Sequence, residues 1–481
     1  MIYDVAVIGA GVVGALIARE LSKYNIKIAL IEKYGDIAMG TIKGNSAIVH
    51  AGFDAENGSL KAKLNVKGCG ITEQITRDLL VPYEKNTSLV CAFSESEAEH
   101  LQMLKKRGEA NGVEQLEIIK GDKLFELEPN LSREVTAALY APTAGIVCPF
   151  LLTISAAENA VINGCDLILS FEVDNIESDG GEYLTVKSKD REIKTRYIVN
   201  SAGLYSDEIA AMCGDTDDAI RIIPRRGEYM LMDKNAGSLV KATLFSVPSE
   251  KGKGILVAPT VDGNLIIGPN ADITTKTDTS TTSEGLSEVE AGAKRLVPSL
   301  NTRQVITSFA GIRSTPSNHD FNIFPSKNKN FANVLHLVGI ESPGLASSPA
   351  IAEYVGQMLK DMGLTLIEKT NFNPKMERPK PFREMTDEER AEAVAKNPLY
   401  GKIICRCETV TEAEIISYIH SPYPAKNVDA IKRRTRAGAG RCQGGFCSPR
   451  IVDILARELG GDMTEITKSG GKSYILTGKT K

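Results

Sequence analysis

The feature that most constrains the fold lies at the start of the chain, where three glycines separate an apolar strand from an apolar helix. Residues 3–8 form a β-branched run, and Gly9, Gly11 and Gly14 follow in the pattern G-x-G-x-x-G. The first glycine permits a tight turn, the second lets backbone approach a pyrophosphate, and the third lets helix pack on strand. A second strand over residues 27–32 completes a strand–helix–strand unit, which predicts an α/β fold with a parallel, Rossmann-like sheet.

The residue that ends this second strand indicates the ligand. Glu32 is placed to accept hydrogen bonds from both hydroxyls of a ribose that carries no 2′-phosphate. A glycine turn alone fits any α/β protein, but strand, glycines, helix and terminal acid together predict a dinucleotide. Strand patterns at 197–200 and 334–339 indicate a sheet interrupted by long insertions and resumed late, which favours a tightly held FAD over NAD.

Composition excludes several classes of protein. The 481 residues predict more than one domain, and 42% apolar with 25% charged residues is ordinary globular usage. Lysine and arginine number 57 against 61 acids, so no overall charge excess favours nucleic acid. The longest apolar run, 5–18, is too short for a membrane helix and lacks the pattern of a secretory signal. We expect a cytosolic protein that reaches a membrane only through a partner.

Patterns of strands, helices and turns divide the chain into two domains, a linker and a module. The predicted FAD-binding domain comprises residues 1–80, 141–218 and 311–371; the inserted substrate domain, with a mixed or antiparallel sheet, comprises 81–140 and 219–310; a linker covers 372–400; and a small helical module covers 401–465.

Four of the nine cysteines cluster in this last module. They form the pairs Cys405-x-Cys407 and Cys442-x4-Cys447, and four soft ligands in a cytosolic protein indicate a metal. Zinc modules commonly use C-x2-C pairs, and neither pair has that spacing. Lys432, Arg433, Arg434, Arg436, Arg441 and Arg450 surround the second pair. A charge run is usually a solvated face, but here we expect these cations to stabilise an anionic cluster and to attract an acidic electron acceptor.

Several sequence segments along the chain resemble those of one known family. They are VIGAGVVG with Glu32, NSAIVHAGFD, VNSAGLYSD, PRRGEYM, GKGILVAPTVDGNLIIGP, AGIRS and VGIESPGLASSPAIA. In this order, from residue 1 to about 365, they resemble FAD-dependent glycerol-3-phosphate dehydrogenases and oxidases. The wider group, with a D-amino-acid-oxidase-like fold, also holds L-2-hydroxyglutarate and amine or proline dehydrogenases, so fold transfers more safely than substrate. The segments CRCETVTEAEI and TRAGAGRCQGGFC resemble those of the bacterioferritin-associated-ferredoxin-like domain. This resemblance implies a [2Fe-2S] cluster, with zinc as the alternative.

The resemblance implies contacts for FAD beyond the glycines and Glu32. They are Thr41, Asn45 and Ser46 at the flavin end, Val173 at the adenine, Ala202 and Gly203 beside the pyrophosphate, and Gly339, Gly344, Leu345 and Ala346 at the isoalloxazine ring. The last group is a glycine-rich turn that leads into a helix. Its backbone N–H groups suit the part of the flavin where negative charge gathers on reduction.

The same resemblance places His50 beside the flavin, where it would take the hydroxyl proton as hydride leaves carbon for flavin N5. From the residues alone, a structural histidine is the favoured interpretation, and only the resemblance favours the catalytic role. The resemblance also places Lys253 and Arg313 at the substrate, and Ser342 in the late loop is a further candidate for a hydrogen bond to the substrate hydroxyls or to the flavin. The guanidinium group of Arg313 can bind either a phosphate or a carboxylate through two hydrogen bonds. Lys253, which lies between two glycines, favours phosphate. Arg225 and Arg226 are weaker candidates.

These features lead to a hypothesis about function. The enzyme would oxidise sn-glycerol 3-phosphate to dihydroxyacetone phosphate and pass electrons through the cluster to a partner subunit or quinone-linked acceptor. A simple oxidase would not need the module. The alternatives are a dehydrogenase of the same fold that uses L-2-hydroxyglutarate, an amine or proline, and an electron-transfer or redox-sensing scaffold without turnover.

Overall fold

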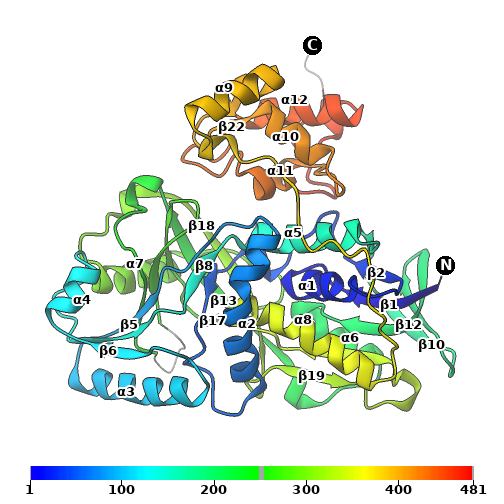
Figure 1. Cartoon of the computed structure of the whole chain (residues 1–481), viewed down its shortest axis with the longest axis horizontal. Coiled ribbons are helices and arrows are strands. Elements are labelled where there is room, and N and C mark those ends of the chain that lie inside the picture. Colours follow the sequence, from blue (N-terminus) through cyan, green and yellow to red (C-terminus); the bar gives the residue numbers. More distant parts are fainter. Residues whose placement is uncertain (1, 249–253, 479–481) are drawn as a thin grey trace.

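The computed structural model describes residues 2–248 and 254–478. Its body has two halves, with the long helix α2 (Leu60–Asp78) running between them, and the carboxyl-terminal residues form a smaller lobe above (Figure 1). No helix in this described part of the chain is both long and apolar enough to cross a membrane.

Eight strands form the sheet of the half that contains the amino terminus. They are β1 (Ile2–Ile8), β2 (Ile28–Ile31), β9 (Asp166–Ile168), β10 (Asn175–Ser178), β11 (Leu184–Ser188), β12 (Arg191–Asn200), β19 (Asn322–Pro325) and β20 (Val334–Val338). The centre is parallel: β9, β2, β1, β12 and β20 lie side by side in that order. β20 joins β12 although it is distant in sequence, so the sheet is interrupted and resumed as the strand patterns predicted.

Helices cover this sheet because their apolar sides need a partner. α1 (Val12–Leu21) packs against α5 (Pro149–Ile162) and α8 (Gly344–Asp361), and α2 also packs on α8. The fully buried Val5, Ala15 and Leu335 belong to one apolar core shared by sheet and helices. α6 (Ser206–Met212) packs beside β20.

Nine strands form the second sheet, in the other half. They are β5 (Ser88–Ala92), β6 (Glu117–Ile119), β7 (Ala137–Ala141), β13 (Ile222–Met232), β14 (Thr243–Ser246), β15 (Leu256–Pro259), β16 (Leu265–Gly268), β17 (Asp272–Ile273) and β18 (Val305–Pro316). Among the described strands of this sheet only β5 and β14 pair in parallel, so the predicted mixed sheet is present. Helices α3 (Glu95–Ala110), α4 (Asp122–Leu127) and α7 (Ser283–Leu296) pack on it, and a small third sheet holds β3 (Ile48–Val49), β4 (Tyr83–Glu84) and β8 (Gly145–Val147). The short 3-10 helices are η1 (Thr41–Lys43), η2 (Gly203–Tyr205), η3 (Asp218–Ile220), η4 (Lys234–Ala236), η5 (Thr302–Gln304), η6 (Lys329–Phe331), η7 (Phe382–Glu384), η8 (Pro398–Gly401) and η9 (Met463–Glu465).

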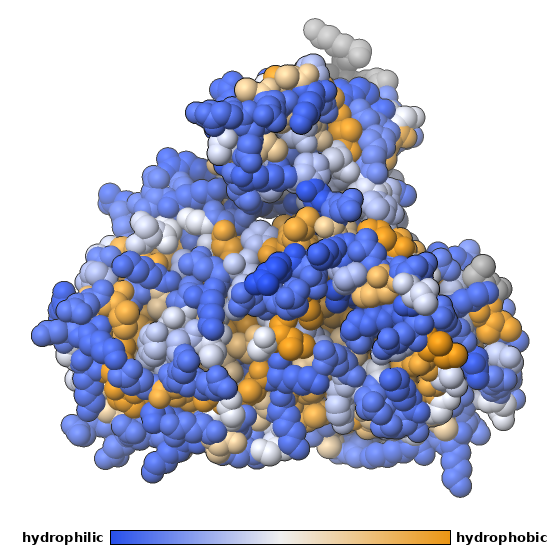
Figure 2. All heavy atoms as spheres, viewed as in Figure 1, coloured by the Kyte–Doolittle hydropathy of each residue, from blue (hydrophilic) through white to orange (hydrophobic). Residues whose placement is uncertain are grey.

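The carboxyl-terminal lobe has its own apolar core. It contains β21 (Ile403–Cys405), β22 (Val410–Thr411), α10 (Glu412–Ile419), α11 (Val428–Thr435) and α12 (Ser448–Leu459), and α9 (Asp387–Lys396) precedes it. Thr411 and Glu414 form a capping box that fixes the start of α10, as the pattern T-x-x-E dictates. Figure 2 shows the lobe standing on the body, with a hollow between them. We call this lobe the module. The α/β fold with an added helical module is therefore confirmed, while the residue limits of the domains stay predictions.

Candidate functional site

A cavity of about 1390 Å³ brings most of the predicted site residues together, from both halves of the body. Its walls include Gly9, Gly11, Glu32, Thr41, Asn45, Ser46, His50, Val173, Ala202, Gly203, Arg313, Ser342, Gly344 and Leu345. Lys253 lies outside the described residues. Segments that are far apart in the sequence thus converge on one elongated space.

Three predicted residues pack behind this wall rather than on it. A Cβ on Gly14 would lie 1.9 Å from the carbonyl oxygen of Gly9, so only glycine lets α1 approach the turn. Gly339 has a φ of +75°, where a side chain would meet Pro316. The carbonyl of Ala346 lies against Gly68 of α2. These residues shape the site through packing.

The end of the cavity at α1 fits a dinucleotide pyrophosphate. A Cβ on Gly11 would meet no protein atom within 4 Å, so this glycine faces open space in front of the helix N-terminus. Glu32 is buried, and the backbone N–H groups of Ala10 and Tyr34 donate to its two oxygens at 2.9 and 3.0 Å. Burial raises the pKa of Glu32, and these two hydrogen bonds oppose that rise. The chain's own residues therefore fit the ribose–pyrophosphate part of FAD.

The opposite end of the cavity is held rigidly. A Cβ on Gly311 of β18 would lie 1.7 Å from the Gly44 carbonyl oxygen, so the two backbones touch. Beside this contact, Thr41 donates to the carbonyl of Ile312 at 3.1 Å. His50 lines the cavity: its carbonyl accepts from Asn65 at 2.8 Å, and its ring packs 5.6 Å from that of Phe245.

Cations gather at this end because β13 and β18 pair in register. Arg225 lies opposite Arg313, and both line the cavity. The Arg225 Nε is buried and has no hydrogen-bond partner within the described residues, and the same residue lines the cavity. Arg226, by contrast, pairs with Asp278 at 2.9 Å.

Sequence reasoning missed several residues that line this end. Tyr229 is buried, which raises its pKa, and Arg313 donates to its hydroxyl. Lys61 and Glu341 form an ion pair at 2.9 Å inside the same cavity. Burial alone would raise the pKa of Glu341, but Lys61 holds it below its ordinary value. The period-two alternation of Arg225 and Tyr229 along one strand is the signal that could have found the tyrosine.

The four predicted cysteines of the module stand in two pairs. The sulfurs of Cys407 and Cys442 are 3.7 Å apart, and Cys405 hydrogen-bonds with Cys447. Two thiolates on one tetrahedral metal with bonds of about 2.3 Å lie about 3.7 Å apart, so the separation of Cys407 and Cys442 fits two ligands of one iron. The hydrogen bond from Cys447 lowers the pKa of Cys405 to about 6, which favours the thiolate that a metal needs. Among the described residues, no group of three or more His, Cys, Asp or Glu side chains is arranged to hold a metal ion.

The cations around the second cysteine pair mostly bind the body. The buried Arg434 pairs with Asp36 at 2.9 Å, Arg433 binds the same carboxylate, and Arg441 pairs with Asp233. Burial alone would raise the pKa of Asp36, but the two arginines hold it below its ordinary value. Much of this basic run therefore forms an interface with the body, which the sequence did not indicate, and its expected effect on the cluster stays a prediction.

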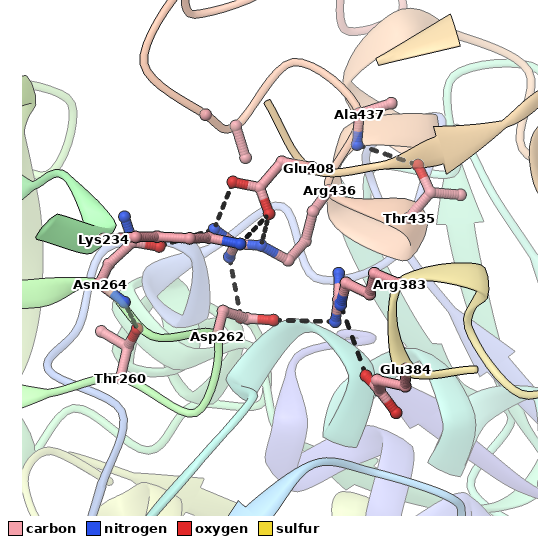
Figure 3. A network of polar contacts seen from close by, with 12 residues as sticks. Lys234, Thr260, Asp262, Asn264, Arg383, Glu384, Glu408, Thr435, Arg436 and Ala437 are labelled. Carbon is pink, nitrogen blue, oxygen red and sulfur yellow. Dashed lines mark hydrogen bonds and ion pairs between the residues drawn. The ribbon is translucent and has the colours of Figure 1, made fainter. Parts of the chain in front are cut away.

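Arg436 lies at the centre of a second contact between module and body (Figure 3). It donates to Asp262 at 2.8 Å, to Asn264 at 2.8 Å and to Glu408 at 2.9 Å. Lys234 of the body reaches the same Glu408 at 3.0 Å. Glu408 directly follows Cys407, so this network fixes the cysteine loop relative to the body.

A second cavity, of about 1190 Å³, lies between body and module. Ile42, Lys43 and Asn45 line both cavities, so the segment around η1 is a wall between the predicted flavin site and the module. On the module side Lys432 also lines the second cavity, and it interacts electrostatically with Cys447.

Comparisons with known proteins agree with this geometry. Residues 4–358 match the FAD dependent oxidoreductase family, and residues 403–457 match the BFD-like [2Fe-2S] binding domain. The chain belongs to this family of FAD-dependent oxidoreductases and carries the iron–sulfur domain at its carboxyl end. FAD and the [2Fe-2S] cluster are confirmed as its cofactors, and the zinc alternative falls away.

Individual relatives show which FAD-dependent oxidoreductases this chain is similar to. The chain is 50% identical over 481 residues, 100% of its length and 99% of the relative's, to a glycerol 3-phosphate dehydrogenase of Caloramator mitchellensis. The L-alpha-glycerophosphate oxidase of Mycoplasma pneumoniae with FAD bound matches with a TM-score of 0.74 and 32% identity, over 79% of this chain and 100% of that one. An L-2-hydroxyglutarate dehydrogenase of Caenorhabditis elegans is 34% identical over 277 residues, 56% of this chain and 63% of the relative. This enzyme is therefore a homologue of FAD-dependent glycerol-3-phosphate dehydrogenases, as the motifs predicted.

Proposed function

We propose that the protein oxidises sn-glycerol 3-phosphate to dihydroxyacetone phosphate and delivers the electrons, through its module, to a one-electron acceptor. The observation that carries the proposal is the match to a glycerol 3-phosphate dehydrogenase along the entire chain, module included. Bound FAD supplies a two-electron acceptor for the hydrogen on the substrate carbon, and the [2Fe-2S] cluster supplies one-electron steps.

Two facing cations support an anionic substrate. Arg313 and Arg225 lie opposite each other on β18 and β13 at one end of the cavity, and the buried Arg225 Nε lacks a partner among the described residues. A phosphate carries two negative charges and enough oxygens to accept from both guanidinium groups. Tyr229 accepts from Arg313, which holds that fork in place. We assign substrate binding to Arg313, with Arg225 as a second anchor and Ser342 beside them.

His50 is the candidate base. It lines the same cavity, its backbone is held by Asn65, and Phe245 packs against its ring. We propose that it takes the proton of the secondary hydroxyl while the adjacent C–H bond breaks. The segment at 339–346, which ends in the N-terminus of α8, would favour negative charge on the reduced ring.

Stopped-flow measurement of flavin bleaching tests the substrate. We expect glycerol 3-phosphate to bleach the flavin, and His50→Asn to slow bleaching by about 10²–10⁴-fold, the usual contribution of a positioned base. Arg225→Met should raise the substrate concentration needed for half-maximal bleaching. Unchanged bleaching in His50→Asn would contradict its assigned role.

L-2-hydroxyglutarate is the second candidate, because a relative named for that substrate matches this chain. Arg313 and Arg225 would then bind carboxylates instead of phosphate. Bleaching that is faster with L-2-hydroxyglutarate than with glycerol 3-phosphate, at equal concentration, would replace the first proposal with this one.

A further inference from the structure

The two cysteine pairs divide the metal site into an inner and an outer half. Cys405 and Cys447 are buried, whereas Cys407 is exposed and Cys442 is partly exposed. The inner pair is the one whose Cys447 interacts with Lys432 on the side of the cavity shared with the body. The outer pair is held by backbone N–H groups of the loop 442–447.

Contacts with the body fix this orientation. Arg434 and Arg433 of α11 bind Asp36, and Glu408 bridges Arg436 and Lys234 (Figure 3). Because α11 is tied to the body by these buried ion pairs, the module cannot turn its inner half outward without breaking them.

Exposed residues that are close in sequence to the cysteines have the character of a protein-docking surface. Phe446, which directly precedes Cys447, is 85% exposed, the highest value among the large apolar side chains of the described residues. Arg406 and Arg450 are exposed and make no ion pair within the described part of the chain, while Arg441 is tied to Asp233. One exposed acid, Asp453, follows on α12.

Such an arrangement matches known interfaces. An exposed aromatic side chain beside cations resembles the centre and rim of a protein interface, where aromatic anchors carry affinity and charges steer approach. An acidic partner complements Arg406 and Arg450, and a basic one is repelled. The outer two cysteines, Cys407 and Cys442, are the ones that reach this surface, where a partner's redox centre can come close.

We propose that Phe446, Arg406 and Arg450 form the docking site for an acidic one-electron carrier protein, which takes electrons at the outer, Cys407–Cys442 half of the site. This inference rests on the proposed function in one respect, which is that the oxidised substrate supplies the electrons. Each substrate molecule oxidised yields two electrons, so it reduces two molecules of a one-electron acceptor, and two protons pass to solvent.

The test uses the full-length protein with both cofactors, reduced by limited dithionite and mixed with oxidised rubredoxin, an acidic one-electron protein, or with cytochrome c, a basic one. Dithionite makes the result independent of the natural substrate: failure of glycerol 3-phosphate to bleach flavin would refute the proposed function and leave this test intact. We expect rubredoxin to oxidise the protein faster than cytochrome c at low salt, and added salt to slow it.

Variants locate the surface. Phe446→Ser, and separately Arg406→Glu with Arg450→Glu, should lower the second-order rate with rubredoxin about tenfold, a typical effect of a hot-spot residue. Lys426→Glu is the matched control. It reverses an exposed charge just before the start of α11 and should change the rate with rubredoxin little. Calorimetric binding of redox-inactive zinc rubredoxin should weaken in the same variants, which separates docking from electron flow.

Flavin and cluster absorbance confirm that each variant is folded. The proposal is overturned if cytochrome c reacts faster than rubredoxin, if neither acceptor reacts, or if Phe446→Ser binds zinc rubredoxin as tightly as the unaltered protein. It is also overturned if this face is covered by a second copy of the chain, which sedimentation would reveal as a dimer that Phe446→Ser dissociates.

Discussion

The pair between Asp36 and Arg434 offers the sharpest test of how the module is held, because it joins body and module with little water nearby. The two side chains are 3% and 0% exposed, and Arg433 binds the same carboxylate. Asp36→Asn keeps the shape but removes the carboxylate to which both buried guanidinium groups are hydrogen-bonded. Removing one partner of a buried ion pair costs about 3–5 kcal/mol, which raises the undocked population more than about 100-fold.

Proteolysis measures that population. Arg433, Arg434 and Arg436 are held in ion pairs with the body while the module is docked, so we expect trypsin cleavage after them to require opening, with a rate that follows the open fraction when reclosing is fast. We expect Asp36→Asn to cleave more than about 100 times faster than the unaltered chain. Asp217→Asn, which weakens an exposed pair with Lys327 at 3.1 Å, is the matched control and should leave the cleavage rate nearly unchanged, because exposed ion pairs contribute little to stability. Equal cleavage rates in the two variants would refute the reasoning.

The same pair predicts a pH dependence. Because the arginines hold the pKa of Asp36 below its ordinary value of 3.8, the docked state binds fewer protons than the undocked one near that pH. Its stabilisation is therefore complete above the ordinary pKa and is lost as pH falls through the lowered one. Small-angle scattering should show one compact shape from pH 8 down to about 5; expansion within that range, absent from Asp36→Asn, would contradict the assignment.

Two pairs of glycine substitutions test the cofactor sites. Gly11→Ala should fold normally yet bind FAD weakly, because its Cβ would occupy space left for the pyrophosphate. Gly14→Ala should lose stability as well as FAD, because its Cβ would lie 1.9 Å from a backbone oxygen. Flavin content and thermal unfolding distinguish them, and equal behaviour would contradict the fit. Gly440→Ala would place a Cβ 2.4 Å from that of Cys407, so iron content should fall, while Gly401→Ala, with 3.6 Å to its nearest neighbour, should retain iron. Full iron in Gly440→Ala would show that the loop is not so tightly packed.

Local signals allowed much of the fold to be predicted. The glycines of the first turn and Glu32 lie within one strand–helix–strand unit, so neighbouring residues alone define their geometry. Clustered thiols of the module are similarly local, because each cysteine pair lies within a few residues. The apolar strand at 334–338 could be placed in the first sheet because it lacks the alternation of a half-exposed strand.

Long-range pairing explains what the sequence did not reveal. The ion pair of Asp36 and Arg434 joins residues 398 positions apart, and nothing near either residue indicates the other. The cations of α11 therefore looked like a free basic surface, although the fold buries them against acids of the body. Lys61 and Glu341 likewise meet only because α2 lies beside the loop that begins α8.

The central claim is that one substrate reduces the flavin and that the electrons then reach the cluster. Anaerobic titration of the intact protein with glycerol 3-phosphate, followed by flavin absorbance and by the paramagnetic signal of the reduced cluster, tests it directly. The account predicts flavin bleaching together with a cluster signal that Asp36→Asn delays. Bleaching without any cluster signal would contradict the proposed route, and a flavin that stays oxidised would contradict the proposed reaction.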